Sequence, residues 1–211
     1  MKTAFINGSP KSKLSSSETI LNDLQSCFSK NIEIINYNLR KSFLTDEEIE
    51  TLFGFDVFVF AFPLYVDGIP SHLLNCLCQI EEAAKNIKDK SITVYVLVNS
   101  GFFEGHQNRL ALDMMKNWCA KVGFEWGQGI GIGSGGALAG LSNIPLGKGP
   151  KSSLGIAFKS LVDNISIKSQ ADNIFVSMNF PRIMYKIIGE FGWRREIKKN
   201  GLKVKDLSRR L

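Results

Sequence analysis

The sequence has few of the residues that build metal centres or disulfide frameworks. Its 211 residues include two histidines and four cysteines, and no two cysteines form a CxxC pair. The cysteines are Cys27, Cys76, Cys78 and Cys119. This composition indicates neither a zinc site nor a disulfide framework, and it is typical of reduced, structural thiols in a cytoplasmic protein.

Long apolar runs are also missing. The longest apolar stretch, residues 57–66, is interrupted by Pro63 and is far shorter than the roughly 20 residues that a membrane-spanning helix needs. Near the N-terminus the apolar run ends at Ile6, which is too short for a secretory signal. We therefore expect a cytoplasmic protein without a membrane span.

Most of the chain lacks a net positive charge, and the excess of basic residues lies near the C-terminus. Residues 182–211 contain ten Lys/Arg against three Asp/Glu, a local charge of +7, whereas residues 1–181 contain sixteen against seventeen. A nucleic-acid interface needs basic residues on the folded body, so the nearly neutral body argues against a nucleic-acid partner. With 44% hydrophobic residues, the chain can bury one sizeable core.

Short β-like runs alternate with segments of helical period. The runs are residues 3–6, 32–35, 56–62, 91–100 and 124–132. This alternation predicts an α/β fold with right-handed crossovers, in which a doubly wound, five-stranded parallel sheet of order 2-1-3-4-5 carries helices on both faces. The ligand crevice of such a sheet lies at the carboxyl ends of strands one and three.

Several helices are predicted from caps and apolar stripes. Thr45 and Glu48 form a capping-box pattern, and Pro70 stands at a helix start. The stripe after this proline is Leu73, Leu74, Leu77 and Ile80, and further helices are predicted near residues 20–28, 110–122 and 154–167. Residues 127–155 contain ten glycines and are expected to form a long loop.

The loop after the first strand reads NGSPKSKLSSS and leads directly into a helix. Ser9 and residues 15–17 offer hydroxyl and N–H groups at the helix N-terminus, which attracts anions, and Lys11 and Lys13 add positive charge. The pattern indicates a phosphate site, although a polar N-cap and turn would use serine too. It lacks the GxxxxGK[ST] pattern of nucleoside triphosphate loops.

Two further loops would converge on the same crevice. After the third strand, Tyr65 offers a flat wall for a planar heterocycle or simply covers the end of the sheet. After the fourth strand, Asn99 and Ser100 offer hydrogen-bond donors and Gly101 allows close backbone approach, while the neighbouring Phe102 either lines the site or covers core.

A glycine pattern of a different kind is rejected. Gly131, Gly133 and Gly136 spell GxGxxG, which in dinucleotide-binding folds opens a helix and precedes an acidic residue by ~20 positions. Here we expect no helix after the glycines, and no Asp or Glu occurs between Glu125 and Asp163.

Together, the segments NGSPKSKLSSS, FPLYVDGIP and NSGFF resemble the flavodoxin-like NAD(P)H-dependent FMN reductase and quinone reductase family. The segment VGFEWGQGIGIGSGG is similar to the fifth-strand region of flavodoxin-family oxidoreductases. The similarity covers roughly residues 1–136. The sequence departs from the family pattern in two places. Residues 15–17 are all serine, where the family usually has an asparagine or threonine among its serines, and Phe102 follows Gly101 where a second glycine is common.

The resemblance implies cofactor-binding roles for specific residues. Those near the FMN phosphate would be Ser9, Ser15, Ser16 and Ser17; those flanking the isoalloxazine would be Pro63, Leu64, Tyr65 and Val66; those at its pyrimidine edge would be Asn99, Ser100 and Gly101. Lys11 and Phe102 are the other expected cofactor-binding residues, and the bulk of Phe102 would narrow the substrate pocket. Backbone N–H groups of Ser100 and Gly101 would stabilise the reduced flavin, and the resemblance implies no catalytic acid or base.

The resemblance further implies hydride transfer from NAD(P)H through FMN to a small acceptor such as a quinone, nitroaromatic, azo compound or flavin. It also implies a homodimer. Two alternatives stay open, namely an electron carrier that NAD(P)H does not reduce directly, and a phosphate- or nucleotide-binding module without redox activity.

The basic tail lies outside this resemblance. We expect a flavodoxin-like FMN-binding domain over residues 1–178 and a basic helical extension over residues 179–211 that packs on the body or on a dimer mate. Binding of an anionic partner or of the additional phosphate of NADPH, and an interfacial membrane helix, are the other interpretations.

Overall fold

The computed structural model describes residues 1–12, 15–29, 32–87, 91–141 and 143–208. Lys13, which we associated with the first loop, lies outside this described part. The chain divides into two compact units, Met1–Met178 and Asn179–Leu211, which are described separately. Whether the second unit packs on the first or on another copy of the chain stays a prediction.

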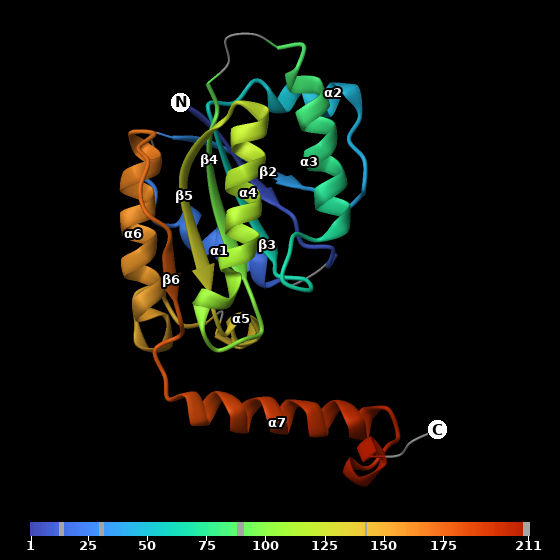
Figure 1. Cartoon of the computed structure of the whole chain (residues 1–211). Coiled ribbons are helices and arrows are strands. Elements are labelled where there is room, and N and C mark those ends of the chain that lie inside the picture. The colour runs from blue at the N-terminus through green and yellow to red at the C-terminus, as the bar shows by residue number, and fades with distance from the viewer. Residues whose placement is uncertain (13–14, 30–31, 88–90, 142, 209–211) are drawn as a thin grey trace. The chain divides into compact units, whose positions relative to one another are not determined.

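The first unit is built on a six-stranded, all-parallel sheet with the order β2-β1-β3-β4-β5-β6 (Figure 1). The strands are β1 Lys2–Asn7, β2 Glu33–Asn38, β3 Val57–Pro63, β4 Thr93–Asn99, β5 Glu125–Ile132 and β6 Ile174–Val176. The predicted order of the first five strands is confirmed. The sixth strand is an addition that we did not predict, because a run of three residues is too short to show a strand pattern in the sequence. All three residues are of intermediate burial.

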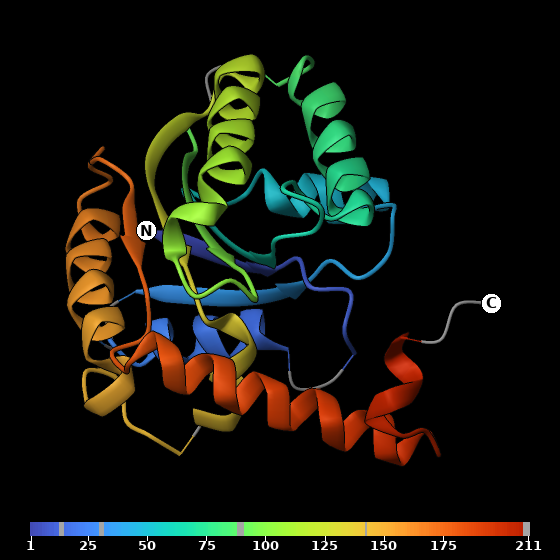
Figure 2. The same cartoon turned by 60° about the horizontal axis from the view of Figure 1, so that its bottom comes forward.

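Helices cover both faces of the sheet. They are α1 Ser16–Gln25, α2 Asp46–Leu52, α3 Ser71–Ala84, α4 Arg109–Val122, the single turn α5 Gly135–Leu138, and α6 Ser152–Ser166. Figure 2 shows α3 and α4 on one side of the sheet and α1 and α6 on the other. Among the described residues of the whole chain, no helix has the length and apolar content required to cross a membrane.

The helix starts follow the capping patterns in the sequence. Thr45 Oγ1 accepts from the Glu48 N–H at 3.2 Å and Glu48 Oε2 accepts from the Thr45 N–H at 2.8 Å, so the predicted capping box is confirmed. In α3, Leu73 is buried as predicted, whereas Leu74 is 40% exposed and lies outside the buried stripe.

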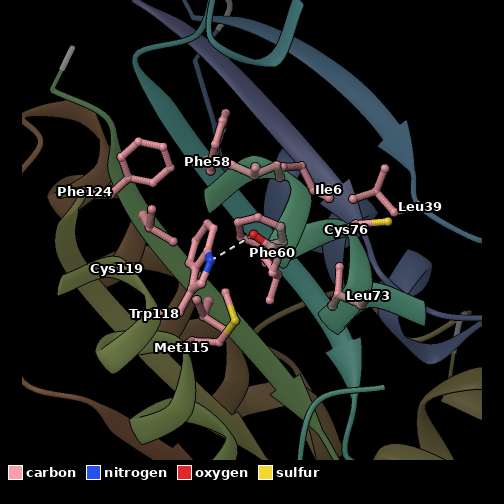
Figure 3. Close-up of a cluster of buried hydrophobic side chains, with 14 of the residues drawn as sticks. Ile6, Leu39, Phe58, Phe60, Leu73, Cys76, Met115, Trp118, Cys119 and Phe124 are labelled. Carbon is pink, nitrogen blue, oxygen red and sulfur yellow. Dashed lines mark hydrogen bonds between the residues drawn. The ribbon is translucent and has the colours of Figure 1, made fainter. Parts of the chain in front are cut away.

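The core between the sheet and α3/α4 is rich in aromatic rings (Figure 3). Trp118 meets Phe60 and Phe124 edge to face, with ring centroids 6.1 and 5.6 Å apart. The Trp118 indole N–H donates to the Leu77 carbonyl at 3.1 Å, so the polar atom of this large side chain is satisfied. Trp118 therefore ties α4 to both β3 and α3.

The glycine-rich segment is more regular than we expected. Residues up to Ile132 belong to β5, and α5 begins at Gly135, followed by 3-10 turns at Ala139–Leu141 and Gly149–Lys151. The expectation of no helix after the GxGxxG pattern is thus wrong by one short turn. Further along, Lys151 is fully buried and forms an ion pair with Asp23 of α1, with 2.5 Å between Nζ and Oδ2.

Replacing Gly127 by alanine is expected to destabilise the first unit by about 1–3 kcal/mol. An added Cβ would overlap the ring of Tyr95, which is fully buried and whose hydroxyl lies 2.8 Å from the Asn164 carbonyl oxygen. Urea unfolding followed by circular dichroism measures the change. Gly140→Ala is the matched control, because its Cβ would meet nothing within 4 Å. Equal stability of the two variants would contradict the overlap.

The second unit contains helix α7, Arg182–Lys199, and a 3-10 helix η4, Val204–Ser208. Pro181 precedes the first helical residue, where its missing N–H costs no hydrogen bond. Ile197 is buried, and its carbonyl accepts from the Leu202 N–H at 3.0 Å. The chain after α7 therefore folds back near Ile197.

Candidate functional site

A cleft of about 190 Å³ lies at the carboxyl ends of β1, β3 and β4. Its lining residues are Ser9, Lys11, Ser16, Ser17, Pro63, Leu64, Tyr65, Asn99, Ser100, Gly101, Gly135 and Gly136. Ten of these twelve belong to the three loops that the sequence pattern placed at this crevice. The parallel sheet brings the loops together because all its strands end on the same side.

Asn99 joins three elements beneath the cleft. Its side-chain amide donates to Ser17 Oγ at 2.9 Å and to the Phe62 carbonyl at 3.0 Å, linking the end of β4 to α1 and β3. Both amide protons are thereby used inside the protein. Asn99 is 4% exposed, so its structural role is to fix the position of Ser17 relative to the sheet.

The three consecutive serines have different roles. Ser15 caps α1, since its hydroxyl accepts from the Glu18 N–H at 3.0 Å, and it does not line the cleft. Ser16 lines the cleft and donates its hydroxyl proton to the Gly135 carbonyl at 2.8 Å. Ser17 accepts from Asn99, which leaves its own hydroxyl proton available to the cleft.

The start of the first loop is held by close packing. An added Cβ at Gly8 would lie 2.5 Å from Leu73 Cδ2 and 3.2 Å from Phe62 Cβ, so the side chains of α3 and β3 leave room only for glycine. Ser9 follows, buried, with its N–H donating to Asn7 Oδ1 at 3.0 Å. This packing directs the loop toward the N-terminus of α1.

The loop after β3 forms a tight turn that presents Tyr65 to the cleft. The N–H and carbonyl groups of Tyr65 and Gly68 pair at 3.1 and 3.0 Å. The two residues between them, Val66 and Asp67, have φ values of 48° and 58°, an unfavourable region for a β-branched side chain. The Val66 side chain is fully exposed and does not line the cleft.

The loop after β4 differs from our expectation in one hydrogen bond. The Ser100 N–H donates to the Ile132 carbonyl at 3.0 Å and is therefore used within the protein. The Ser100 hydroxyl is buried and has no hydrogen-bond partner among the described residues. Gly101 has open space where a Cβ would project. Phe102 is half-exposed and does not line the cleft.

Gly135 and Gly136 are lining residues that sequence reasoning missed. The Gly135 N–H donates to the Ser100 carbonyl at 2.7 Å, and an added Cβ would lie 2.9 Å from the same oxygen. The preceding Gly133 donates to the Val176 carbonyl of β6 at 2.8 Å, so the unpredicted strand supports this loop. The signal in the sequence was the GxGxxG pattern, which we considered only as a dinucleotide fingerprint.

Titratable groups in the lining offer little acid–base chemistry. Lys11 supplies positive charge, and neither histidine lines the cleft. All four cysteines are free thiols outside the cleft, and burial raises the pKa of Cys119 to about 12. Among the described residues, no group of His, Cys, Asp and Glu could hold a metal ion. The arrangement is suited to binding an anionic group beside a planar one.

No protein-family model and no curated protein matches the chain. Solved structures do. One is an NADPH-quinone reductase from P. pentosaceus, at 13% identity and a TM-score of 0.57, covering 77% of this chain and 98% of that one. Another is an NADH:FMN oxidoreductase, at 12% identity and a TM-score of 0.58, covering 81% of this chain and 90% of that one.

A WrbA-like flavodoxin from Agrobacterium tumefaciens gives 13% identity, a TM-score of 0.51, and coverage of 79% of this chain and 96% of that one. Similarity at this identity concerns the arrangement of helices and strands. The chain therefore has the flavodoxin-like α/β fold that its loop sequences resemble.

Proposed function

We propose that the protein is an FMN-dependent oxidoreductase that passes hydride from NAD(P)H through bound FMN to a small acceptor. The observation that carries this proposal is the cleft itself. Residues from three separate loops, each expected from the resemblance to contact one part of FMN, line a single cleft at the carboxyl ends of the strands.

The residues present fit the phosphate end of this cofactor. The N-terminus of α1 offers unpaired N–H groups, Ser17 has a hydroxyl proton to donate, and Lys11 adds a positive charge. Helix N-termini stabilise anions in this way in many proteins. The Ser15 hydroxyl is used as the cap, so its contribution to a phosphate would be through positioning α1.

The residues present also fit the ring end. Pro63, Leu64 and Tyr65 form a largely apolar wall, and the buried Ser100 hydroxyl has a proton to donate at the opposite loop. Preorganised donors of this kind stabilise charge that develops on a bound group. Bound FMN would supply the redox chemistry, accepting hydride from NAD(P)H and delivering electrons to the acceptor. The protein would bind, orient and shield the reacting groups.

The substrates and assembly are part of the same proposal. A quinone, nitroaromatic, azo compound or free flavin would fit a cleft that offers a planar wall and no acid–base pair. The reductase and oxidoreductase names of the similar structures support this class of reaction. We propose a homodimer in which a second copy completes the open side of the cleft.

The first test is the visible absorption spectrum of the purified protein with added FMN, followed by anaerobic NADPH and then NADH. Retained flavin bands that bleach with either nucleotide support the reductase. Flavin bands that persist with both would show an electron carrier instead. Failure to retain flavin would point to a module that binds another phosphate compound.

Ser100→Ala separates the cofactor role of this hydroxyl from a structural one. Loss of a hydrogen bond to FMN is expected to weaken FMN binding by about tenfold. The free energy of unfolding without FMN should stay unchanged or rise by up to about 1 kcal/mol, because a buried donor without a partner is removed. Fluorescence titration and urea unfolding measure the two quantities. A destabilised variant with normal FMN affinity would contradict the assignment.

A further inference from the structure

Helix α7 carries an exposed apolar stripe on its first ten residues. The stripe comprises Ile183, Met184, Ile187, Ile188 and Phe191, whose spacing of three and four residues places them along one side of the helix. All five are exposed, with Ile183 at 67% and Phe191 at 68%. Large apolar side chains gathered on one exposed face mark an interaction surface.

The same side of the helix becomes basic after Phe191. Continuing the spacing leads to Arg194, Arg195, Lys198 and Lys199. Two carboxylates offset part of this charge, through the Glu190–Arg194 contact at 3.8 Å and the Glu196–Lys199 contact at 2.7 Å. Over the whole helix, six Lys/Arg stand against two Glu. Apolar and basic residues thus follow one another along a single side, which we call the α7 face.

The edge of the α7 face is used inside the second unit. Ile197, the buried residue of the helix, follows Arg194 by three residues and so borders the α7 face, and the chain returns near it at Leu202. The apolar stripe nevertheless stays exposed, so the fold-back leaves this part of the α7 face uncovered within its own unit. Trp193, one turn before Ile197, lies beyond this edge.

We propose that the α7 face binds the surface of a membrane containing anionic lipids. The apolar half would enter the boundary between headgroups and acyl chains, and the basic half would lie against the headgroups, with the helix parallel to the surface. Complementary charge selects this partner, since residues 182–211 have a net charge of +7. Two such tails would repel each other, and a nucleic acid would leave the apolar stripe exposed to water.

The test is flotation of the full-length protein with lipid vesicles. One set contains phosphatidylcholine alone, and the other contains roughly one third phosphatidylglycerol. We expect binding to the anionic vesicles only, reduced by salt because exposed charges are screened. The measurement needs no flavin, so its result is independent of the proposed redox function.

One single variant and one double variant, each with a matched control, probe the apolar and the basic half of the α7 face. Ile187→Asn is expected to lower vesicle binding at least about tenfold, by loss of apolar burial. Arg195→Gln with Lys198→Gln is expected to lower it by about tenfold or more. The controls make equal changes on the first unit: Ile156→Asn, at a residue 76% exposed on α6, and Lys116→Gln with Lys159→Gln. The controls should bind as the parent does.

Two results would overturn the proposal. One is the absence of binding to anionic vesicles, and the other is equal binding to neutral ones. If binding is absent and light scattering shows a dimer that Ile187→Asn converts to a monomer, the α7 face belongs to an interface with a second copy of the chain.

Discussion

Ser16→Asp is expected to weaken FMN binding at least about a hundredfold while leaving the fold intact. Ser16 lines the cleft at the first residue of α1, so a carboxylate there would face the phosphate of the cofactor. Like charges a few ångströms apart at a partly exposed site repel by several kcal/mol. The same carboxylate interacts favourably with the N-terminus of the helix, which offsets the lost hydrogen bond to Gly135.

Fluorescence titration with FMN and with riboflavin measures this effect. Riboflavin lacks the phosphate, so its affinity should change little, and the ratio of the two affinities isolates the electrostatic contribution. Ser71→Asp is the matched control, because it adds the same charge at the first residue of α3, outside the cleft lining. Equal FMN affinity in the parent and Ser16→Asp would show that the phosphate does not bind at α1.

Trp118→Ala is expected to lower the free energy of unfolding by about 3–5 kcal/mol. The substitution removes the ring that packs against Phe60 and Phe124, and it removes the indole N–H that donates to the Leu77 carbonyl. Neighbouring side chains come from separate strands and helices, so the cavity could close only partly (Figure 3). Urea unfolding followed by far-ultraviolet circular dichroism gives the value.

Trp193→Ala serves as the comparison for this large effect. Trp193 is 72% exposed on α7, so removing an indole there should change the unfolding free energy of the first unit by less than about 0.5 kcal/mol. If both variants lost the same stability, the loss would reflect the general effect of removing tryptophan and would not reflect core packing.

The central sheet was predictable because its strands are chemically distinctive. β3 and β4 are almost continuous runs of β-branched and aromatic residues, buried on both faces as parallel strands require. β6 gave no such signal, since three residues show neither period nor a full apolar run. Leu74 shows the opposite error, because it was predicted to be part of the buried stripe of α3 and is exposed. The buried side of α3 is narrower than the sequence pattern indicates.

The cleft was predictable where a loop directly follows a recognisable strand. Prediction was weaker where a hydrogen bond decides the role of a group. The Ser100 N–H donates to a carbonyl of β5, and the Ser15 hydroxyl accepts from the N–H of Glu18 as the cap of α1. Neither hydrogen bond can be predicted from the residue type. Gly135 was missed because its position depends on contacts with Ser100, far away in the sequence. The roles of Ser15, Val66 and Phe102 toward a cofactor stay predictions.

The sixth strand has a consequence for protein engineering. β6 ends at Val176 and Met178 is buried, so the first unit completes its sheet before the second unit begins at Asn179. Limited proteolysis at residues 179–181 would therefore release the basic segment without removing a strand or exposing β5 as a new edge. The C-terminal segment can in this sense be exchanged for another, leaving the cleft and its supporting strand together in one fragment.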